Sequence, residues 1–250
     1  MKGIYINEMG LPEDAILSTA IDDFSLRTIG DEQMILHCFQ HSGINMGWDD
    51  TRLPGYPLGK EYYKKKGIPL FLRNAGGRSI VADEGVLNMS LTLTGISDYK
   101  EAYRYYDLFI KEALAPYTTR IETKEIHGAY CPGDTDLSLM NKKFCGTAQR
   151  KRRNATNLVS YISVSGNQDQ RGELVKGFYE AMGDYPIVIE PQTMETLSRL
   201  TAQLLTPVQI ASQFFETLKK RCDHIQVIRK FNPDYPDLQK SIQATLRRNQ

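Results

Sequence analysis

Residues 86–93 read Val-Leu-Asn-Met-Ser-Leu-Thr-Leu, and their side chains alternate between apolar and polar from Leu87 to Leu93. A period of two predicts a β-strand with one buried and one solvated face. Residues 78–82, Arg-Ser-Ile-Val-Ala, form a second run of strand character, and the turn Asp83-Glu84-Gly85 joins it to the first. The two runs together predict a β-hairpin.

Further strand and helix patterns flank this pair. Runs of strand character occupy residues 34–39, 69–73, 119–126, 143–148 and 158–165. Helical patterns occupy residues 12–26, 59–66 and 169–182, and the polar residues 49–55 are predicted to form a loop. Asp98 and Glu101 form a capping box, which predicts the start of another helix. The apolar face of that helix is Ala102, Tyr106, Phe109, Ile110 and Ala113.

The chain changes character near its C-terminus, where helix is predicted throughout from Thr193 onward. Thr206, Pro207 and Gln209 stand at the cap, first and third positions of a helix start. Strands interleaved with helices, followed by a helical tail, predict an α+β fold. We expect one domain over residues 1–220, with its core at about 30–185, and a C-terminal helical segment over 190–250 packed on it.

The composition is that of an ordinary globular protein. The 250 residues carry a net charge of +1 and are 41% hydrophobic, which excludes a disordered chain and a generally basic nucleic-acid coat. The first residues lack the apolar core of a signal peptide, and no apolar run is long enough for a membrane helix. The four cysteines are too few and too scattered for a disulfide scaffold or a zinc site. We therefore expect a cytoplasmic protein with free thiols.

Three segments could carry chemistry: residues 73–78, 128–137 and 141–149. Arg73-Asn74-Ala75-Gly76-Gly77-Arg78 contains paired glycines, which by themselves predict a plain turn; an arginine on each side favours an anionic or carbonyl-bearing ligand. Cys131 stands beside Pro132-Gly133, so its sulfur is expected on an accessible loop. A loop cysteine taken alone is more often structural than catalytic. A lysine ammonium held against it favours the thiolate, however, and Lys143 is near enough in sequence to do so.

Other residues leave alternatives open. His127 could serve as the base for Cys131, but a satisfied histidine at a strand end is the better interpretation. No acidic residue stands between Leu137 and Gln168, and the run Arg150-Lys151-Arg152-Arg153 falls within that stretch. A solvated face is the default meaning of such a run. Among binding functions, an acidic protein partner for Arg150, Arg152 and Arg153 explains it at least as well as nucleic acid.

Several motifs, in this order and spacing, resemble the lipoate–protein ligase and octanoyltransferase superfamily, and within it the amidotransferases of lipoyl assembly. The resemblance covers roughly residues 30–220. Its motifs are Asp49–Pro54, Arg73–Gly77, Asp83–Leu91, Tyr130-Cys131-Pro132-Gly133, Asp136-Leu137-Ser138 and Lys142-Lys143-Phe144, continued by Gly146 and Gln149-Arg150.

The resemblance implies the fold of the biotin/lipoate ligase catalytic domain, a mixed β-sheet packed with helices. It implies that Cys131 is the nucleophile that forms an acyl-thioester and that Lys143 favours its thiolate. It also implies substrate binding at Arg73, Gly76, Gly77 and Gly146. Two residues depart from the family pattern: Arg78 follows the paired glycines, where small or apolar residues are usual, and Cys145 stands where alanine or serine is common.

The activity implied is protein lipoylation by acyl transfer. An octanoyl or lipoyl group would pass from a lysine of the glycine cleavage H protein to lipoyl domains of 2-oxo acid dehydrogenases. The exchange would need no ATP, metal, nucleic acid or membrane. An octanoyl-acyl carrier protein donor, an ATP-dependent lipoate ligase on the same fold, and a non-catalytic binding module remain as alternatives.

Overall fold

The centre of the molecule is an eight-stranded mixed sheet. The computed structural model describes residues 1–10, 14–96, 98–183, 187–232 and 234–250. The strands run in the order β11-β1-β2-β6-β10-β9-β8-β7. β1 pairs in parallel with β2 and β11, and the other neighbours are antiparallel. Their bounds are β1 Lys2–Asn7, β2 Gln33–Phe39, β6 Val86–Thr94, β7 Glu122–Thr123, β8 Leu137–Leu139, β9 Lys142–Arg152, β10 Ala155–Ser163 and β11 His224–Ile228.

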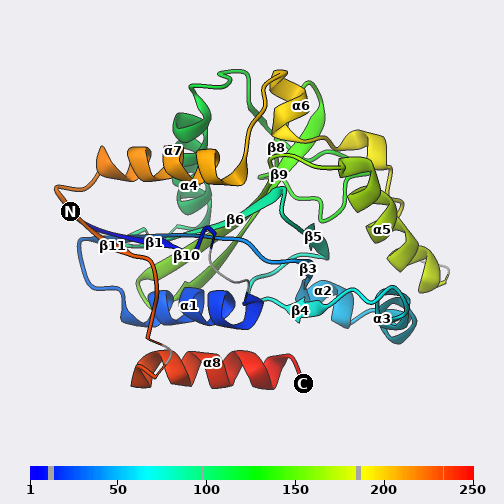
Figure 1. The fold of residues 1–250 in the computed structure, drawn as a ribbon, viewed down its shortest axis with the longest axis horizontal. Coiled ribbons are helices and arrows are strands. Elements are labelled where there is room, and N and C mark those ends of the chain that lie inside the picture. Colours follow the sequence, from blue (N-terminus) through cyan, green and yellow to red (C-terminus); the bar gives the residue numbers. More distant parts are fainter. Residues whose placement is uncertain (11–13, 97, 184–186, 233) are drawn as a thin grey trace.

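A second sheet of three strands, in the order β4-β3-β5, lies beside the first (Figure 1). Its strands are β3 Gly43–Met46, β4 Leu70–Leu72 and β5 Ile80–Ala82. The predicted hairpin is therefore wrong: β5 and β6 follow one another in sequence but pair in different sheets. The reason lies in the turn, where Arg171 holds the Asp83 carboxylate with contacts of 2.6 and 2.7 Å and fixes a corner between the sheets.

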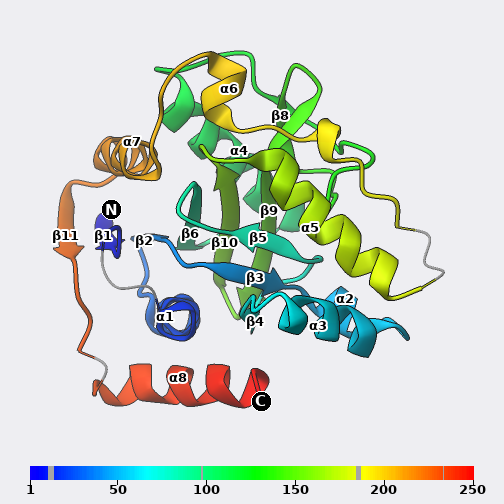
Figure 2. The ribbon, with the colours of Figure 1, turned by 45° about the vertical axis from the view of Figure 1, so that its right-hand side comes forward.

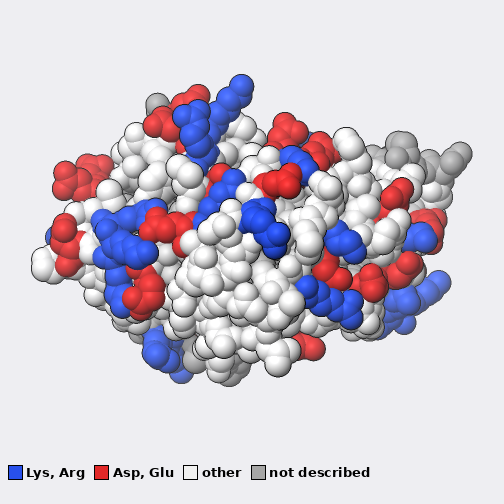
Figure 3. Space-filling model, turned by 90° about the horizontal axis from the view of Figure 1, so that it is seen from above, with Lys and Arg blue, Asp and Glu red and all other residues white. Residues whose placement is uncertain are grey.

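Helices cover both faces of the large sheet. In Figures 1 and 2, α4 and α7 lie on one face, α1 lies on the other, and α8 lies outside α1. The helices are α1 Ala15–Thr28, α2 Trp48–Thr51, α3 Tyr56–Lys65, α4 Tyr99–Leu114, α5 Gln168–Ala181, α6 Leu197–Thr201, α7 Pro207–Lys219 and α8 Pro236–Arg248. Seen from the α7 side, basic and acidic side chains lie interspersed, in keeping with the near-neutral net charge (Figure 3).

The two predicted helix starts are confirmed. At α7 both halves of the capping box form between Thr206 and Gln209, and a cap of this kind stabilises a helix by about 1 kcal/mol. At α4 the Asp98 carboxylate accepts the Glu101 amide hydrogen. The predicted apolar face of α4 is wholly buried. It packs on the face of β6 that carries Leu87, Met89, Leu91 and Leu93.

The other face of β6 is also buried, so the predicted solvated face is wrong. Its polar side chains have internal partners instead of water: Asn88 accepts a hydrogen bond from Asn45, Ser90 donates to Asp22, and Thr92 accepts from Asn157. Buried polar groups are stable only when they are paired in this way. This face of the sheet looks toward α1 and borders the site described below.

Several other elements differ from the prediction in their bounds or were not predicted. The predicted loop 49–55 begins with the short helix α2, and Asp50 within it is fully buried, accepting from Ser79 and Tyr179. The predicted strand 119–126 shrinks to β7. The strand β1 was not predicted, and neither was β11, which interrupts the helical C-terminal segment. The predicted helix start at residue 12 falls among residues 11–13, outside the described residues; the described helix begins at Ala15.

Candidate active site

The loop between β7 and β8 presents the Cys131 thiol. Cys131 is half-buried and has a backbone φ of 47°, in the left-handed region that residues with a side chain rarely adopt. Strained backbone of this kind persists only where the surrounding structure imposes it, and it is frequent at active sites. The sulfur is thus neither walled off in the core nor free in solvent. The loop position agrees with the prediction from Pro132-Gly133.

Two donors point at the sulfur, and both come from the turn after β4. The main-chain N–H of Arg78 lies 3.2 Å from Sγ, and the Arg73 guanidinium lies 3.7 Å from it. Gly77 allows this approach: its φ is 88°, and a Cβ atom there would lie 3.0 Å from both Sγ and the Arg73 guanidinium. A main-chain amide and a guanidinium therefore face the sulfur from the same turn.

Main-chain carbonyl groups hold the Arg73 guanidinium in place. It donates to the carbonyl oxygens of Asn45, Gly76 and Arg78 at 2.7 to 2.8 Å. The guanidinium therefore ties β3 to both sides of the glycine turn. Gly76 contributes to the site through its carbonyl group, whereas Gly77 contributes the space in which the sulfur lies.

Lys143 lies beneath the same loop. Its ammonium is fully buried, donates to the main-chain carbonyls of Tyr130 and Cys131, and forms an ion pair of 2.8 Å with Asp136. The hydrogen bonds of Lys143 thus hold the main chain of the nucleophile loop, and the cation that hydrogen-bonds the sulfur is Arg73. The role expected for Lys143 at the thiolate stays a prediction.

Asp136 completes this buried ion pair. Burial raises the pKa of its carboxyl group to about 6, although Lys143 and the Gly133 amide both oppose the rise. The Gly133 amide donates to the carboxylate at 3.0 Å. The pair therefore clamps both ends of the Cys131–Asp136 segment to β9.

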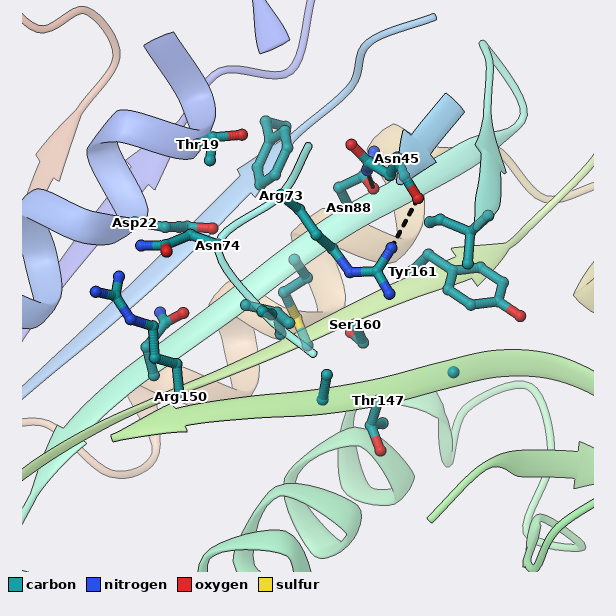
Figure 4. Close-up of a pocket in the computed structure, with 18 of the residues that line it drawn as sticks. Thr19, Asp22, Asn45, Arg73, Asn74, Asn88, Thr147, Arg150, Ser160 and Tyr161 are labelled. Carbon is teal, nitrogen blue, oxygen red and sulfur yellow. Dashed lines mark hydrogen bonds between the residues drawn. The ribbon is translucent and has the colours of Figure 1, made fainter. Parts of the chain in front are cut away.

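An apolar cavity opens beside Cys131, between the large sheet and α1 (Figure 4). Its apolar walls include Leu26, Phe39, Ala75, Ile80 and Val159. Polar side chains gather at the end next to α1. In Figure 4, Thr19, Asp22, Asn74 and Arg150 lie at this end, apart from Tyr161 and Thr147 at the other. The apolar walls suit a bound chain that is itself apolar and has its reactive end at the sulfur of Cys131.

Gly146 lines the same cavity from β9. A Cβ atom on Gly146 would lie 2.5 Å from the Tyr161 ring, so the position needs glycine. Arg73, Gly76, Gly77 and Gly146, the expected substrate-binding residues, all border this cavity or the turn beside it.

The three arginines expected to bind a partner differ in burial and in contacts. Arg150 is half-buried in the cavity and bonds the buried Asp23 at 2.6 Å. Burial lowers its pKa, and Asp23 opposes that effect. Arg153 is exposed at the far end of β9, and Arg152 is intermediate. The expected binding of a partner by Arg150, Arg152 and Arg153 stays a prediction.

The side chains of other residues singled out from the sequence do not contact the sulfur. The His127 side chain is 92% exposed and lies 3.3 Å from Glu125. The side chain of Arg78 pairs with Asp50 at 3.4 Å, while its amide faces the sulfur. Cys145 is fully buried, and burial raises the pKa of its thiol.

Several residues of the site were not anticipated. Asn45, Asn88, Asp23 and Tyr161 line the cavity from four different elements. Asn88 falls within the motif 83–91 but was not singled out there, and the other three lie outside the motifs. The fold brings all four together only through long-range packing of α1, β3, β6 and β10. Within the described ranges, no group of three or more His, Cys, Asp or Glu side chains is placed to hold a metal ion. None of the helices in the described part of the chain is long and apolar enough to span a membrane.

Comparisons with known proteins agree on one family. The lipoyl protein ligase A/B catalytic domain matches residues 14–219. An octanoyl-[GcvH]:protein N-octanoyltransferase of Oceanobacillus iheyensis is 33% identical over 254 residues, covering 96% of this chain and 90% of that protein. A lipoyl-[GcvH]:protein N-lipoyltransferase of Listeria monocytogenes is 33% identical over 201 residues, covering 75% of this chain and 72% of that protein.

Solved structures show the same fold at low identity. A putative lipoate protein ligase from T. acidophilum with bound lipoic acid has a TM-score of 0.73 at 16% identity, covering 99% of this chain and 96% of that one. A lipoate-protein ligase A bound with ATP has a TM-score of 0.72 at 16% identity, covering 98% of this chain and 94% of that one. The expected fold class, a mixed sheet packed with helices as in the biotin/lipoate ligase catalytic domain, is confirmed.

Proposed function

The chain belongs to the lipoyl protein ligase A/B catalytic domain family, and we propose that it is a protein N-octanoyltransferase or lipoyltransferase that works through a thioester on Cys131. The donor is acylated GcvH, the donor that the names of the relatives give. We place the acyl group on a lysine of that protein, and the acceptor is the lysine of a lipoyl domain of a 2-oxo acid dehydrogenase. The observation that carries the proposal is the half-exposed Cys131 sulfur, bonded by the Arg78 amide at the mouth of an apolar cavity.

The chemistry is an exchange of like bonds. The thiolate attacks the carbonyl carbon of the donor amide, the C–N bond breaks, and the donor lysine leaves as an amine carrying the proton of the thiol. The amine of the acceptor lysine then attacks the thioester, the C–S bond breaks, and the thiol is restored. One amide is consumed and one is formed, so the free energy change is close to zero. The exchange therefore needs neither nucleotide nor metal.

The residues around the sulfur have different roles in the proposed reaction. The Arg78 amide and the Arg73 guanidinium stabilise the thiolate, and they are also placed to stabilise the oxyanion of each tetrahedral intermediate. Lys143 holds the carbonyls of Tyr130 and Cys131 and supplies a buried positive charge behind the loop. It thereby fixes the strained backbone that presents the sulfur.

The apolar cavity holds the acyl chain. Each methylene group that leaves water contributes about 0.8 kcal/mol, so an eight-carbon chain is held by several kcal/mol. The filled cavity also keeps water from the thioester, which would otherwise hydrolyse. We place the reaction in the cytoplasm, where a reactive thiol stays reduced.

The test combines the purified protein, octanoyl-GcvH and an apo lipoyl domain without nucleotide, and follows all three by intact mass. We expect octanoyl transfer and a hydroxylamine-labile octanoyl adduct on the enzyme. Cys131→Ala abolishes both, whereas Cys222→Ala, which removes a thiol at the edge of the core far from the loop, leaves both unchanged. Transfer that survives Cys131→Ala would show that Cys131 is not the nucleophile.

Two further arms separate the alternatives. Transfer that requires free lipoate, ATP and magnesium, with release of AMP, identifies a ligase instead. Transfer from an octanoyl-acyl carrier protein in place of octanoyl-GcvH would change the donor and leave the thioester mechanism standing. Salt-sensitive binding of the lipoyl domain without any adduct would leave only a binding module.

A further inference from the structure

Cys131 borders a second cavity that the acyl chain does not need. This cavity lies on the α4 side of β9, and its walls include Tyr99 and Tyr103, the loop residues 132–135, and Gln149. Cys131, Thr147 and Ala148 line both cavities. The sulfur therefore lies where an apolar cavity and a more polar cavity meet.

The reaction requires two directions of approach at this sulfur. In each tetrahedral intermediate the carbonyl carbon carries the acyl chain, the sulfur and the nitrogen of a lysine. If the chain fills the cavity next to α1, the lysine must extend away from it. The cavity beside α4 is the space that leads from Cys131 in that other direction.

The walls of this second cavity suit a lysine side chain. The rings of Tyr99 and Tyr103 pack edge to face, with their centroids 5.0 Å apart. Aromatic rings attract an ammonium group and also pack along methylene groups. Burial and the neighbouring Tyr99 raise the pKa of Tyr103, so its hydroxyl stays neutral, and it contacts Thr135. These rings would guide the amine inward without trapping it as a tight ion pair.

The charges that line this cavity indicate the kind of protein that brings the lysine. Lys100 and Arg104 are exposed on α4. Of the acidic residues in the lining, Asp107 is already paired, with Lys111 at 3.0 Å, and Asp134 is exposed on the 132–135 loop, across the cavity from the two cations of α4. Exposed cations that surround an entrance favour a partner surface with acidic side chains next to the lysine.

We propose that the cavity between α4 and the 132–135 loop receives the lysine side chain of the donor and acceptor proteins, with Tyr99 and Tyr103 as its aromatic wall. The partner surface is a protein loop whose lysine is flanked by acidic residues, which meet Lys100 and Arg104. This inference rests on the proposed acyl transfer through Cys131.

The experiment separates loading of the sulfur from delivery to lysine. Cys131 is first acylated with a small activated donor, an octanoyl thioester of N-acetylcysteamine, and the adduct is followed by intact mass. An apo lipoyl domain or hydroxylamine is then added. Tyr103→Ala and Tyr99→Ala are expected to load like the wild type and to react equally with hydroxylamine, but to transfer to the lipoyl domain at least tenfold more slowly.

Tyr105→Ala is the matched control. Tyr105 lies on the same helix and is likewise half-buried, but it faces Arg221. Its replacement should leave both steps unchanged, and Tyr103→Phe, which keeps the ring, should transfer nearly as well as the wild type. Lys100→Glu combined with Arg104→Glu should raise KM for the lipoyl domain about tenfold while kcat stays unchanged.

Transfer at wild-type rate by both Tyr99→Ala and Tyr103→Ala overturns the proposal. Tyr99 is 63% exposed, so Tyr99→Ala tests the wall even if Tyr103→Ala fails to fold. A wild-type protein that forms no adduct on Cys131 instead overturns the acyl transfer itself, which keeps the two failures distinct.

Discussion

One cluster of buried charges lies under the loop that carries Cys131 and another lies at the α1 end of the apolar cavity, and the two clusters have different roles. At the sulfur end the Lys143–Asp136 pair lies under the nucleophile loop and holds its main chain. At the α1 end Asp23 accepts from Arg27, Arg150, Asn74 and Ser241, so it joins α1, β9, the turn after β4 and the C-terminal helix α8. The first cluster positions a reactive atom. The second, made of Asp23 and the residues that donate to it, forms the α1 end of the cavity, here called its floor.

The two clusters should affect different measurements. A defect under the loop should lower the rate of acylation, because it moves Cys131. A defect at the floor should change which chains fit and how firmly α8 is held, and leave the chemistry at the sulfur intact. Both clusters are costly to break, because a buried charge that loses its partner keeps its full desolvation penalty.

Lys143→Met should have the largest effect. It leaves the Asp136 carboxylate buried without a cation, which costs about 3–5 kcal/mol of unfolding free energy. Denaturant unfolding and single-turnover acylation of Cys131 should both show the loss. Lys143→Met combined with Asp136→Asn should recover much of the stability while acylation stays slow. Full recovery of acylation would show that Lys143 serves the fold alone.

Lys142→Met is the control for this pair of variants. Lys142 is the preceding residue on β9 and is only partly buried. Its replacement should change the unfolding free energy by no more than about 0.5 kcal/mol.

Gly77→Ala should lower acylation by about 100-fold, because displacement of a reacting atom by a fraction of an ångström to an ångström has consequences of that order. Its Cβ would press on Sγ and on the Arg73 guanidinium, and its φ of 88° disfavours any side chain. Gly76→Ala is the matched control, since a Cβ atom there meets nothing within 4 Å. Equal acylation rates in the two variants would contradict the close approach of the turn to the sulfur.

The sequence predicted the sulfur end of the site far better than the floor. Cys131, the glycine turn and Lys143 stand in short local motifs, and local geometry suffices to place a cysteine beside Pro-Gly on a loop. The floor depends on Asp23 from α1 and Ser241 from α8, which are 218 positions apart. No local pattern signals such a contact.

The same division applies to the fold. Helices α4 and α7 were predictable because their caps and apolar faces are local signals. The corner between β5 and β6 was not, because a short turn between two strands is compatible with one sheet or two. β11 is a largely exposed edge strand that pairs with β1. Three of its five residues are β-branched, a short strand signal that the prediction of helix throughout the C-terminal segment overlooked.

Arg150→Met tests the floor directly and should have a smaller effect. It removes one of the two cations at Asp23 and widens the α1 end of the cavity, so loading with an octanoyl thioester should fall by about tenfold and the preference among chain lengths should change. Arg153→Met, at an exposed position of the same hairpin, should leave loading unchanged. Normal loading in both variants, with slower transfer to the lipoyl domain, would show instead that Arg150 and Arg153 both belong to a surface that binds the partner protein.

A third ionic group, next to the floor, predicts how stability changes with pH. His37 is fully buried and donates to Asp22 and Glu8, both at 2.9 Å. Burial alone lowers the pKa of His37, but these two carboxylates outweigh it and raise the pKa from 6.5 to about 9. The folded state therefore holds a proton that the unfolded state has lost between these values. His37 contributes its full stabilisation below pH 6.5 and loses it as the pH rises toward 9.

The unfolding free energy should accordingly fall between pH 6.5 and 9, by at most about 1.4 kcal/mol per pH unit. Burial alone raises the pKa of Glu8, but the hydrogen bond from His37 outweighs it and lowers that pKa, so the contribution of Glu8 fades on the acid side instead. Urea unfolding across this range should show the fall in the wild type and in His127→Gln, whose histidine is exposed, and lose it in His37→Gln. A wild-type stability that stays flat from pH 6.5 to 9 would mean that neutral hydrogen bonds hold His37 against Asp22 and Glu8. The ionic contacts would then be confined to the Asp23 cluster and to the Lys143–Asp136 pair under Cys131.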